Sequence, residues 1–177
     1  ATNAIVDNDF LVKKVAFRVS ILPLVAIGSE LIVHSILVLF LVIAFLSYAY
    51  FPSLYWLQLF YYVFVSIVLL LGLSWLTSSI RVFVKDIGAF IAVIIQIGFW
   101  ATPIFWQLTM VPEKYQYLFK LNPMYYIIDG FRDTFINNVW FWEKPYETSY
   151  FLISTSLILL TGALVFKKLR PHFGDVL

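Results

Sequence analysis

Glu30 and His34 are the first candidates for chemistry in this sequence, because they are ionisable residues inside a long apolar run. They are four positions apart and therefore share one face of a helix. Ionisable groups within a membrane usually face a bundle interior or a water-filled cavity, where such a pair can relay protons. The alternatives are a mutually satisfied pair, or a Glu30 that faces another subunit. Without a second buried carboxylate the relay has thin support, and we favour the structural interpretation.

Asp129 and Arg132 are the second candidates and lie one helical turn apart. They can pair on a helix surface, but an exposed pair of this spacing contributes only ~0.3–0.5 kcal/mol. Arg132 therefore needs another partner if it matters for function. A guanidinium binds a phosphate in a bidentate fork that lysine cannot reproduce, which makes a diphosphate or an acidic sugar a candidate. The alternative is an arginine that only reaches lipid headgroups.

Familiar catalytic and cofactor motifs are absent from the sequence. It has no GxxxxGK[ST] run to hold ATP phosphates, no HExxH and no GxSxG, and its two histidines are far apart. It has no cysteine, which excludes disulfides and thiolate metal sites. We therefore expect no catalytic residue, no metal and no cofactor on this chain, and no nucleic-acid partner.

The composition indicates an all-α protein that crosses a membrane several times. The chain is 62% hydrophobic, 20% aromatic and only 12% charged, and its mean hydropathy is +0.91. A soluble domain of this size does not have such a composition. Four segments approach the ~20 apolar residues that a bilayer core requires. They are residues 21–46, 57–76, 87–106 and 150–166.

Basic residues predict the orientation of these spans. Eight of the 12 basic residues lie in short segments beside the span ends on one side, whereas the other side has an uncharged loop and a long mixed loop. The positive-inside rule therefore places both termini of this chain in the cytoplasm. The eight are Lys13, Lys14, Arg18, Arg81, Lys85, Lys167, Lys168 and Arg170.

Residues 101–137 lie between the last two predicted spans. Pro103 should kink or end the third span near Trp100, because it removes a backbone donor. Asn122 and Pro123 then form an N-cap and a first helical position. An amphipathic helix follows over residues 122–137, with the stripe Met124, Ile127, Ile128, Phe131 and Phe135. It is either an interfacial helix on lipid headgroups or a helix that dips back into the membrane and covers a pathway.

The N-terminal stretch over residues 4–20 reads as a capped, basic, amphipathic segment before the first span. Asp7 or Asn8 is the candidate cap, and Lys13 and Lys14 lie near the helix end, where the macrodipole favours cations. One interpretation is a juxtamembrane anchor on lipid phosphates.

Several motifs are distributed along the whole chain: "LVKKV" with "ILPL", "RVFVKDIGAF", "TPIFW", "VPEKYQYLFKLNP" with "YYIIDGFRDTF", and the ending "FGDVL". Together they resemble the membrane subunit of type-2 ABC exporters, and within that group the permeases for O-antigen and related lipid-linked polysaccharides. Lys85 stands where arginine is common in that family. The resemblance implies a coupling helix that fits an ATPase cleft, and two short gate helices at the extracytoplasmic mouth. It also implies that the first two of the family's six spans are missing here.

On this resemblance the chain is one transmembrane permease domain, residues 1–177. Residues 1–20 form the coupling segment, 21–106 three spans, 107–148 the gate helices, 149–167 the last span and 168–177 a cytoplasmic tail. The implied ATPase-coupling residues are Asp7, Asn8, Leu11, Val12, Lys13 and Lys14. The implied gate and substrate-path residues are Trp100, Pro103, Phe105, Trp106, Asn122, Pro123, Tyr125, Asp129 and Arg132.

The resemblance further implies a homodimer in the bacterial inner membrane with an ABC ATPase subunit that carries ATP and Mg. The implied substrate is a polysaccharide on a polyprenyl diphosphate carrier. A teichoic acid or capsular polysaccharide exporter is the alternative within the family. An ion-coupled secondary transporter that uses Glu30 and His34, and a membrane-bound glycosyltransferase or ligase, are the alternatives outside it.

Overall fold

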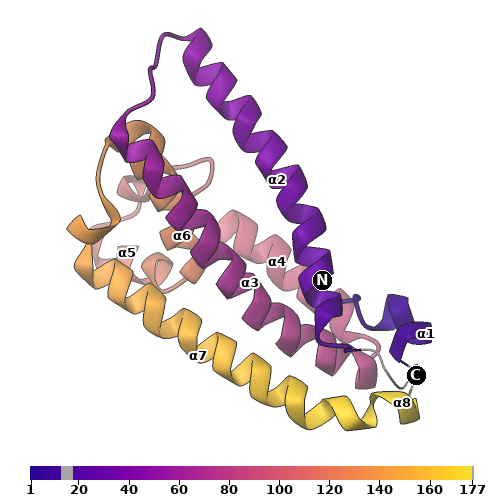
Figure 1. Cartoon of the computed structure of the whole chain (residues 1–177). Helices are drawn as coiled ribbons and strands as arrows, with labels where there is room; N and C mark the ends of the chain where they lie inside the picture. The colour runs from indigo at the N-terminus through magenta and orange to yellow at the C-terminus, as the bar shows by residue number, and fades with distance from the viewer. Residues whose placement is uncertain (13–17, 177) are drawn as a thin grey trace. The chain divides into compact units, whose positions relative to one another are not determined.

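The computed structural model describes residues 1–12 and 18–176, which form two compact units. Unit 1 contains Ala1–Pro52, Ile67–Gly88 and Ile158–Leu177 (Figure 1). Unit 2 contains Ser53–Ser66 and Ala89–Leu157. All regular elements in the described residues are helical, which confirms the all-α prediction.

Among the described residues, three helices are long and apolar enough to cross a bilayer. They are α2 (Ile21–Ser47), α3 (Gln58–Phe83), which follows the 3-10 turn η2 (Leu54–Leu57), and α7 (Pro145–Leu169), which continues into η6 (Arg170–His172). These helices contain the predicted spans 21–46, 57–76 and 150–166 almost completely. They confirm an integral membrane protein with several spans.

The fourth apolar helix, α4 (Ile87–Ala101), has 15 residues and is shorter than the other three. Its end confirms the prediction for Pro103, which is fully buried just beyond it and cannot donate a backbone hydrogen bond. The predicted third span, 87–106, is thus helical over only its first part. A total of four spans remains a prediction.

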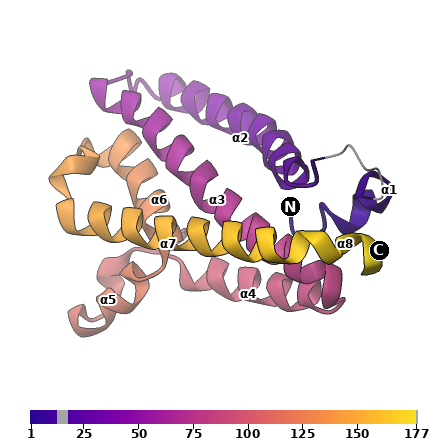
Figure 2. The same cartoon turned by 60° about the horizontal axis from the view of Figure 1, so that its bottom comes forward.

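Unit 1 has a small apolar core that joins the two ends of the chain. The turn η1 (Val6–Asn8) and helix α1 (Asp9–Val12) follow Ile5, which is completely buried. Ile5 shares the core with Leu22, Phe166 and Phe173, the first residue of α8 (Phe173–Val176). Both views place α1 beside α8 (Figure 2). The Trp75 indole N–H donates to the Ser20 carbonyl at 3.3 Å and fixes the start of α2 to α3.

Most of α2 has an apolar and exposed surface in unit 1. Only Leu22, Pro23 and Ile27 of this helix are buried, all in its first two turns. Beyond them, large side chains such as Ile36, Leu37 and Phe40 are more than half exposed. Such a surface requires lipid or another polypeptide against it.

Helices α3 and α7 cross at two glycines in unit 1. A Cβ added at Gly162 would lie 2.2 Å from the carbonyl oxygen of Gly72, and one added at Gly72 would lie 2.7 Å from the Leu159 Cα. Small residues at such a crossing let two backbones approach closely, which is the usual basis of helix association in membranes.

Unit 2 holds the short helices between α4 and α7. They are η3 (Leu108–Met110), α5 (Glu113–Lys120), α6 (Pro123–Arg132), a π-helical turn labelled η4 (Asp133–Asn137) and η5 (Phe141–Glu143). Helix α6 lies against the first part of α3. A Cβ added at Gly130 would lie 2.0 Å from the Tyr62 ring, so glycine is required for this contact.

We predict that Gly162→Ala destabilises unit 1 by ~1–3 kcal/mol, because the new methyl group forces two helix backbones apart. The thermal midpoint of the detergent-solubilised protein should fall. Gly28→Ala is the matched control, since nothing lies within 4 Å of a Cβ at Gly28. Equal midpoints for Gly162→Ala and Gly28→Ala would rule out a tight crossing.

Candidate functional site

The segment after α4 is held to helix α6 by two side chains. Arg132 Nη2 donates to the carbonyl oxygens of Ile104, at 2.8 Å, and of Trp106, at 3.5 Å. Asn122 Nδ2 donates to Thr102 Oγ1 at 2.9 Å. Both ends of α6 therefore donate hydrogen bonds to the segment around Pro103, Arg132 to its backbone carbonyls and Asn122 to the Thr102 hydroxyl.

Asn122 also caps α6. Its Oδ1 accepts from the Met124 N–H at 3.0 Å, and Pro123 is the first helical residue. The structure thus confirms the predicted N-cap and the proline at the first position. One amide side chain starts the helix and attaches it to Thr102, which is itself buried.

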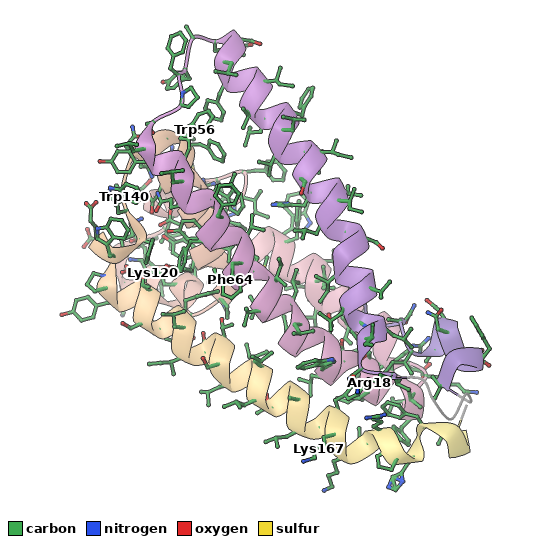
Figure 3. The ribbon with its side chains drawn as sticks, in the orientation of Figure 1. Arg18, Trp56, Phe64, Lys120, Trp140 and Lys167 are labelled. Atoms are coloured by element: carbon green, nitrogen blue, oxygen red, sulfur yellow. The ribbon has the colours of Figure 1, made fainter. Side chains whose placement is uncertain are left out.

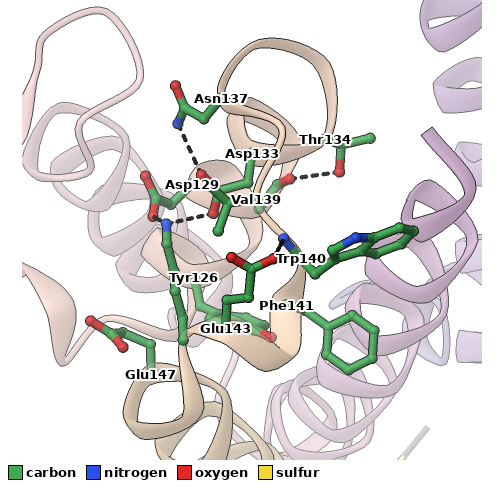
Figure 4. A network of polar contacts seen from close by, with 12 residues as sticks. Tyr126, Asp129, Asp133, Thr134, Asn137, Val139, Trp140, Phe141, Glu143 and Glu147 are labelled. Atoms are coloured by element: carbon green, nitrogen blue, oxygen red, sulfur yellow. Dashed lines mark hydrogen bonds and ion pairs between the residues drawn. The ribbon is translucent and has the colours of Figure 1, made fainter. Parts of the chain in front are cut away.

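Lys144 connects the end of α6 to the segment before α7. Its Nζ lies 2.7 Å from Asp129 Oδ2 and 2.5 Å from Asp133 Oδ2. Asp133 is only 2% exposed, and its Oδ1 also accepts from Asn137 Nδ2 at 2.9 Å (Figure 4). Asp129 therefore binds Lys144, and the described residues show no ion pair between Asp129 and Arg132, the pairing that their spacing allowed.

The surroundings of this cluster keep Lys144 charged and the phenols of Tyr125 and Tyr126 neutral. Burial by itself lowers the pKa of Lys144, but hydrogen bonds to Asp129 and Asp133 and their charges outweigh it, so that its pKa is raised. Burial, with the Asp129 charge, raises the pKa of Tyr125 to about 12. Burial also raises the pKa of Tyr126 to about 12, although hydrogen bonds to Thr148 and Tyr61 oppose this. Both phenols remain neutral at physiological pH.

Aromatic rings pack around this cluster in unit 2. The Tyr126 and Phe151 rings stack with centroids 4.5 Å apart, and the Trp140 and Trp142 rings stack at 4.4 Å. Figure 3 shows Trp56 and Trp140 among the side chains of unit 2. Trp56 packs edge-on against Phe135 at 5.0 Å. These contacts give Trp56 and Trp140 definite packing roles.

A cleft of about 660 Å³ opens in unit 2 beside Arg132. Its size is within the range of ligand pockets. Aromatic rings, amides and charged groups all line it, a mixture that suits a polar ligand with apolar faces. The lining includes Phe105, Trp106, Gln107, Gln116, Lys120, Tyr125, Asp129, Arg132, Asn137 and Lys144.

Five of the nine predicted gate residues line this cleft: Phe105, Trp106, Tyr125, Asp129 and Arg132. The other four lie elsewhere in unit 2. Trp100 is 68% exposed, Pro103 is buried, and Asn122 and Pro123 begin α6. Sequence reasoning missed Lys144, Lys120 and Asp133. The signal for Asp133 was its place in the predicted helix 122–137, and it begins the π-helical turn η4. Nothing in the local spacing joins it to Lys144.

The predicted coupling residues lie in unit 1, where they are described only in part. Asp7 is exposed, and Asn8 Nδ2 donates to the Ala4 carbonyl at 2.9 Å. Val12 packs against the core that contains Ile5. The turn η1 begins after Ile5 without a side-chain cap, and a cap at Asp7 or Asn8 for the helix that follows stays a prediction. Lys13, Lys14 and the Leu11 side chain lie outside what the structure describes.

Glu30 and His34 are both exposed on α2, one turn apart. They lie beyond Ile27, in the part of α2 that has no buried residue. In unit 1 this face is therefore open to lipid or to another chain.

The long apolar helices define an integral membrane protein, and comparison with known proteins identifies its class. The family model described as ABC-2 type transporter matches residues 1–136. An O-antigen export system permease protein RfbA from Klebsiella pneumoniae is 31% identical over the whole chain, which covers 69% of that protein. A second protein of that name and organism is 29% identical with the same coverage.

The chain belongs to the ABC-2 type transporter family. It is a permease subunit of an ABC transporter and not an enzyme, and ATP hydrolysis belongs to a separate ATPase subunit of the transporter. The resemblance stated from the sequence motifs is therefore confirmed at the level of the family.

We predict that Lys144→Met destabilises unit 2 by ~1–3 kcal/mol, because it leaves the buried Asp133 carboxylate without its cation. A raised lysine pKa contributes stability that is complete below the ordinary value of 10.5 and is lost only as pH rises through the folded-state pKa. The loss of thermal stability should therefore be the same at about pH 7 and at about pH 9.

Lys144→Met with Asp133→Asn should recover part of this stability, since the amide needs no counter-ion. Lys114→Met is the control, because Lys114 is an exposed lysine of α5 outside the cluster. An unchanged midpoint in Lys144→Met would contradict the prediction.

Proposed function

We propose that this permease exports a lipid-linked polysaccharide of the O-antigen type across the bacterial cytoplasmic membrane. The observation that carries the proposal is the similarity to two O-antigen export permeases over the full length of this chain. The cleft beside Arg132 adds support, because aromatic rings suit the apolar faces of sugars while amides and charges suit their hydroxyl and acidic groups. Hydrolysis of ATP, bound with Mg on the partner ATPase, supplies the energy.

We further propose that the end of unit 1 with α1 and α8 is cytoplasmic and that α5 and α6 lie at the opposite, extracytoplasmic side. The basic residues Arg18, Arg81, Lys167 and Arg170 all belong to unit 1, as the positive-inside rule requires for a cytoplasmic end. Figure 3 shows Arg18 just before α2 and Lys167 near the end of α7. Helices α5 and α6 then serve as the gate helices.

The segment from Asp7 to Lys14 is the proposed contact with the ATPase. In its described part, Val12 packs against the core of unit 1 that contains Ile5. Its outer side offers the exposed Asp7 and Phe10. A movement of the ATPase at this surface would therefore be transmitted to α2 and to the end of α7, which share that core.

The proposed assembly contains two copies of the permease. Support comes from α2, whose apolar surface beyond Ile27 is exposed in unit 1. An interface there would also cover Glu30 and His34, which we take to have structural roles. Native mass spectrometry of the transporter should give two permeases with two ATPase subunits, and a one-to-one complex would exclude the dimer.

We predict that the full transporter hydrolyses ATP faster, by severalfold, when a polyprenyl-diphosphate-linked O-polysaccharide is added to proteoliposomes. Asp7→Lys should reduce this stimulation, because it reverses a charge at the proposed ATPase contact, and should leave the basal rate and membrane insertion unchanged. Stimulation by lipid-linked teichoic acid or capsular polysaccharide alone would assign the substrate to the alternative class. Absence of stimulation by every polysaccharide would contradict the function.

We propose that Arg132 is the central residue of the gate. Its Nη2 holds the Ile104 carbonyl, while the residue also lines the cleft. In the part of the chain that the structure describes, no carboxylate pairs with it. The planar guanidinium of arginine has several N–H donors, so it can hydrogen-bond the backbone and an anion at the same time. The ammonium of lysine is a compact point charge and lacks this planar fork of donors.

We predict that Arg132→Lys lowers polysaccharide export at least about fivefold, the equivalent of ~1 kcal/mol of lost interaction. Membrane insertion and association with the ATPase should be retained. Surface polysaccharide in a strain without its own export permease gives the measurement. Lys114→Gln is the control, because Lys114 does not line the cleft. Normal export by Arg132→Lys would remove Arg132 from the substrate path.

A further inference from the structure

Unit 1 contains a second cleft, far in sequence from the proposed gate. It has a volume of about 510 Å³ and lies where the start of α2, the middle of α3 and the end of α7 come together. Trp75, Ala163 and Phe166 form apolar walls, and Ser20, Lys167 and Arg170 form the polar part. Nothing in the export function proposed above uses this cleft.

The charge of this cleft is entirely positive. Lys167 and Arg170 are three residues apart, a spacing that brings two side chains of a helix together, and both are exposed. Among the residues that the structure describes, no carboxylate lines the cleft. Among the described residues neither cation takes part in an ion pair. The cleft therefore offers two cationic groups to an anion from outside the chain.

The apolar part of the cleft has a fixed geometry. The Trp75 indole N–H donates to the Ser20 carbonyl, and its ring lies 6.3 Å from the Phe166 ring between centroids. Phe166 is buried in the core of unit 1, so this wall is not a mobile side chain. A matching ligand carries negative charge at one end and hydrocarbon at the other.

The cleft also lies at the end of a bilayer-spanning helix. Lys167 and Arg170 are within the last turns of the candidate span Pro145–His172. They follow the predicted apolar span 150–166, and on that prediction they lie at the level of the lipid phosphates. Basic pockets between helices on the cytoplasmic side are known to bind acidic lipid headgroups. A soluble phosphate would satisfy the cations but would leave the apolar walls unused.

We propose that this cleft binds an anionic phospholipid of the surrounding bilayer. Lys167 and Arg170 contact the phosphate of the headgroup, and the first part of an acyl chain lies on Trp75 and Phe166. The bound lipid would fasten the end of α7 to the start of α2 and to the part of α3 around Trp75 from the membrane side. This inference does not depend on which polysaccharide is exported.

The test uses the full-length permease with its ATPase in nanodiscs that contain brominated phosphatidylglycerol or brominated phosphatidylcholine. Bromine near the headgroup end of the acyl chains quenches tryptophan fluorescence on contact. The difference in fluorescence between the wild type and the Trp75→Phe variant gives the contribution of Trp75. We expect stronger quenching of Trp75 by phosphatidylglycerol than by phosphatidylcholine at equal mole fraction. Lys167→Gln and Arg170→Gln should each weaken this preference about fivefold.

Lys168→Gln is the matched control, because Lys168 is an exposed lysine of the same helix that does not line the cleft. It should retain the preference. Equal quenching by the two lipids, or an equal effect of Lys168→Gln, would overturn the proposal. Loss of the preference when millimolar inorganic phosphate or a polyprenyl diphosphate is added would assign the cleft to that ligand instead.

Discussion

Backbone groups freed by Pro103 have to find hydrogen-bond partners without relying on water, and the arrangement of unit 2 follows from this constraint. Helix α4 ends at Ala101, and the carbonyls of Ile104 and Trp106 accept from Arg132. Asn122 binds Thr102 on the same segment. A short helix with a polar residue at each end is thereby attached to an irregular stretch of backbone.

Buried charge has a second organising role in unit 2. Asp133 belongs to a π-helical turn that follows α6 directly, and the residue after that turn, Asn138, has left-handed backbone angles. The wider turn places Asp133 inside the unit, where Lys144 and Asn137 satisfy its oxygens. Such π turns often occur at functional sites. Here the turn also has a structural role, because its Asp133 binds Lys144 and so holds the segment that leads into α7.

Local signals in the sequence predicted the elements well, and distant partners explain what they did not predict. The Asn-Pro start of α6 and the end of α4 at Pro103 depend on neighbouring residues only, and both are confirmed. The prediction of which α6 residues are buried was partly wrong. Met124 is 40% exposed, whereas Tyr125 and Tyr126 are buried. Gly130 and Tyr62 determine that rotation, and Tyr62 belongs to α3, far away in sequence. Lys144 was missed for the same reason.

The length of α4 has a consequence for the bilayer itself. Its 15 residues rise about 22 Å, whereas a hydrocarbon core is about 30 Å thick. A short apolar helix is accommodated by local thinning of the lipid or by polar groups that reach inward, at a cost of fractions of a kcal/mol per Å. On the prediction that α4 crosses the bilayer, the membrane beside it should therefore be thinner than elsewhere, which would shorten the path through hydrocarbon for the proposed substrate.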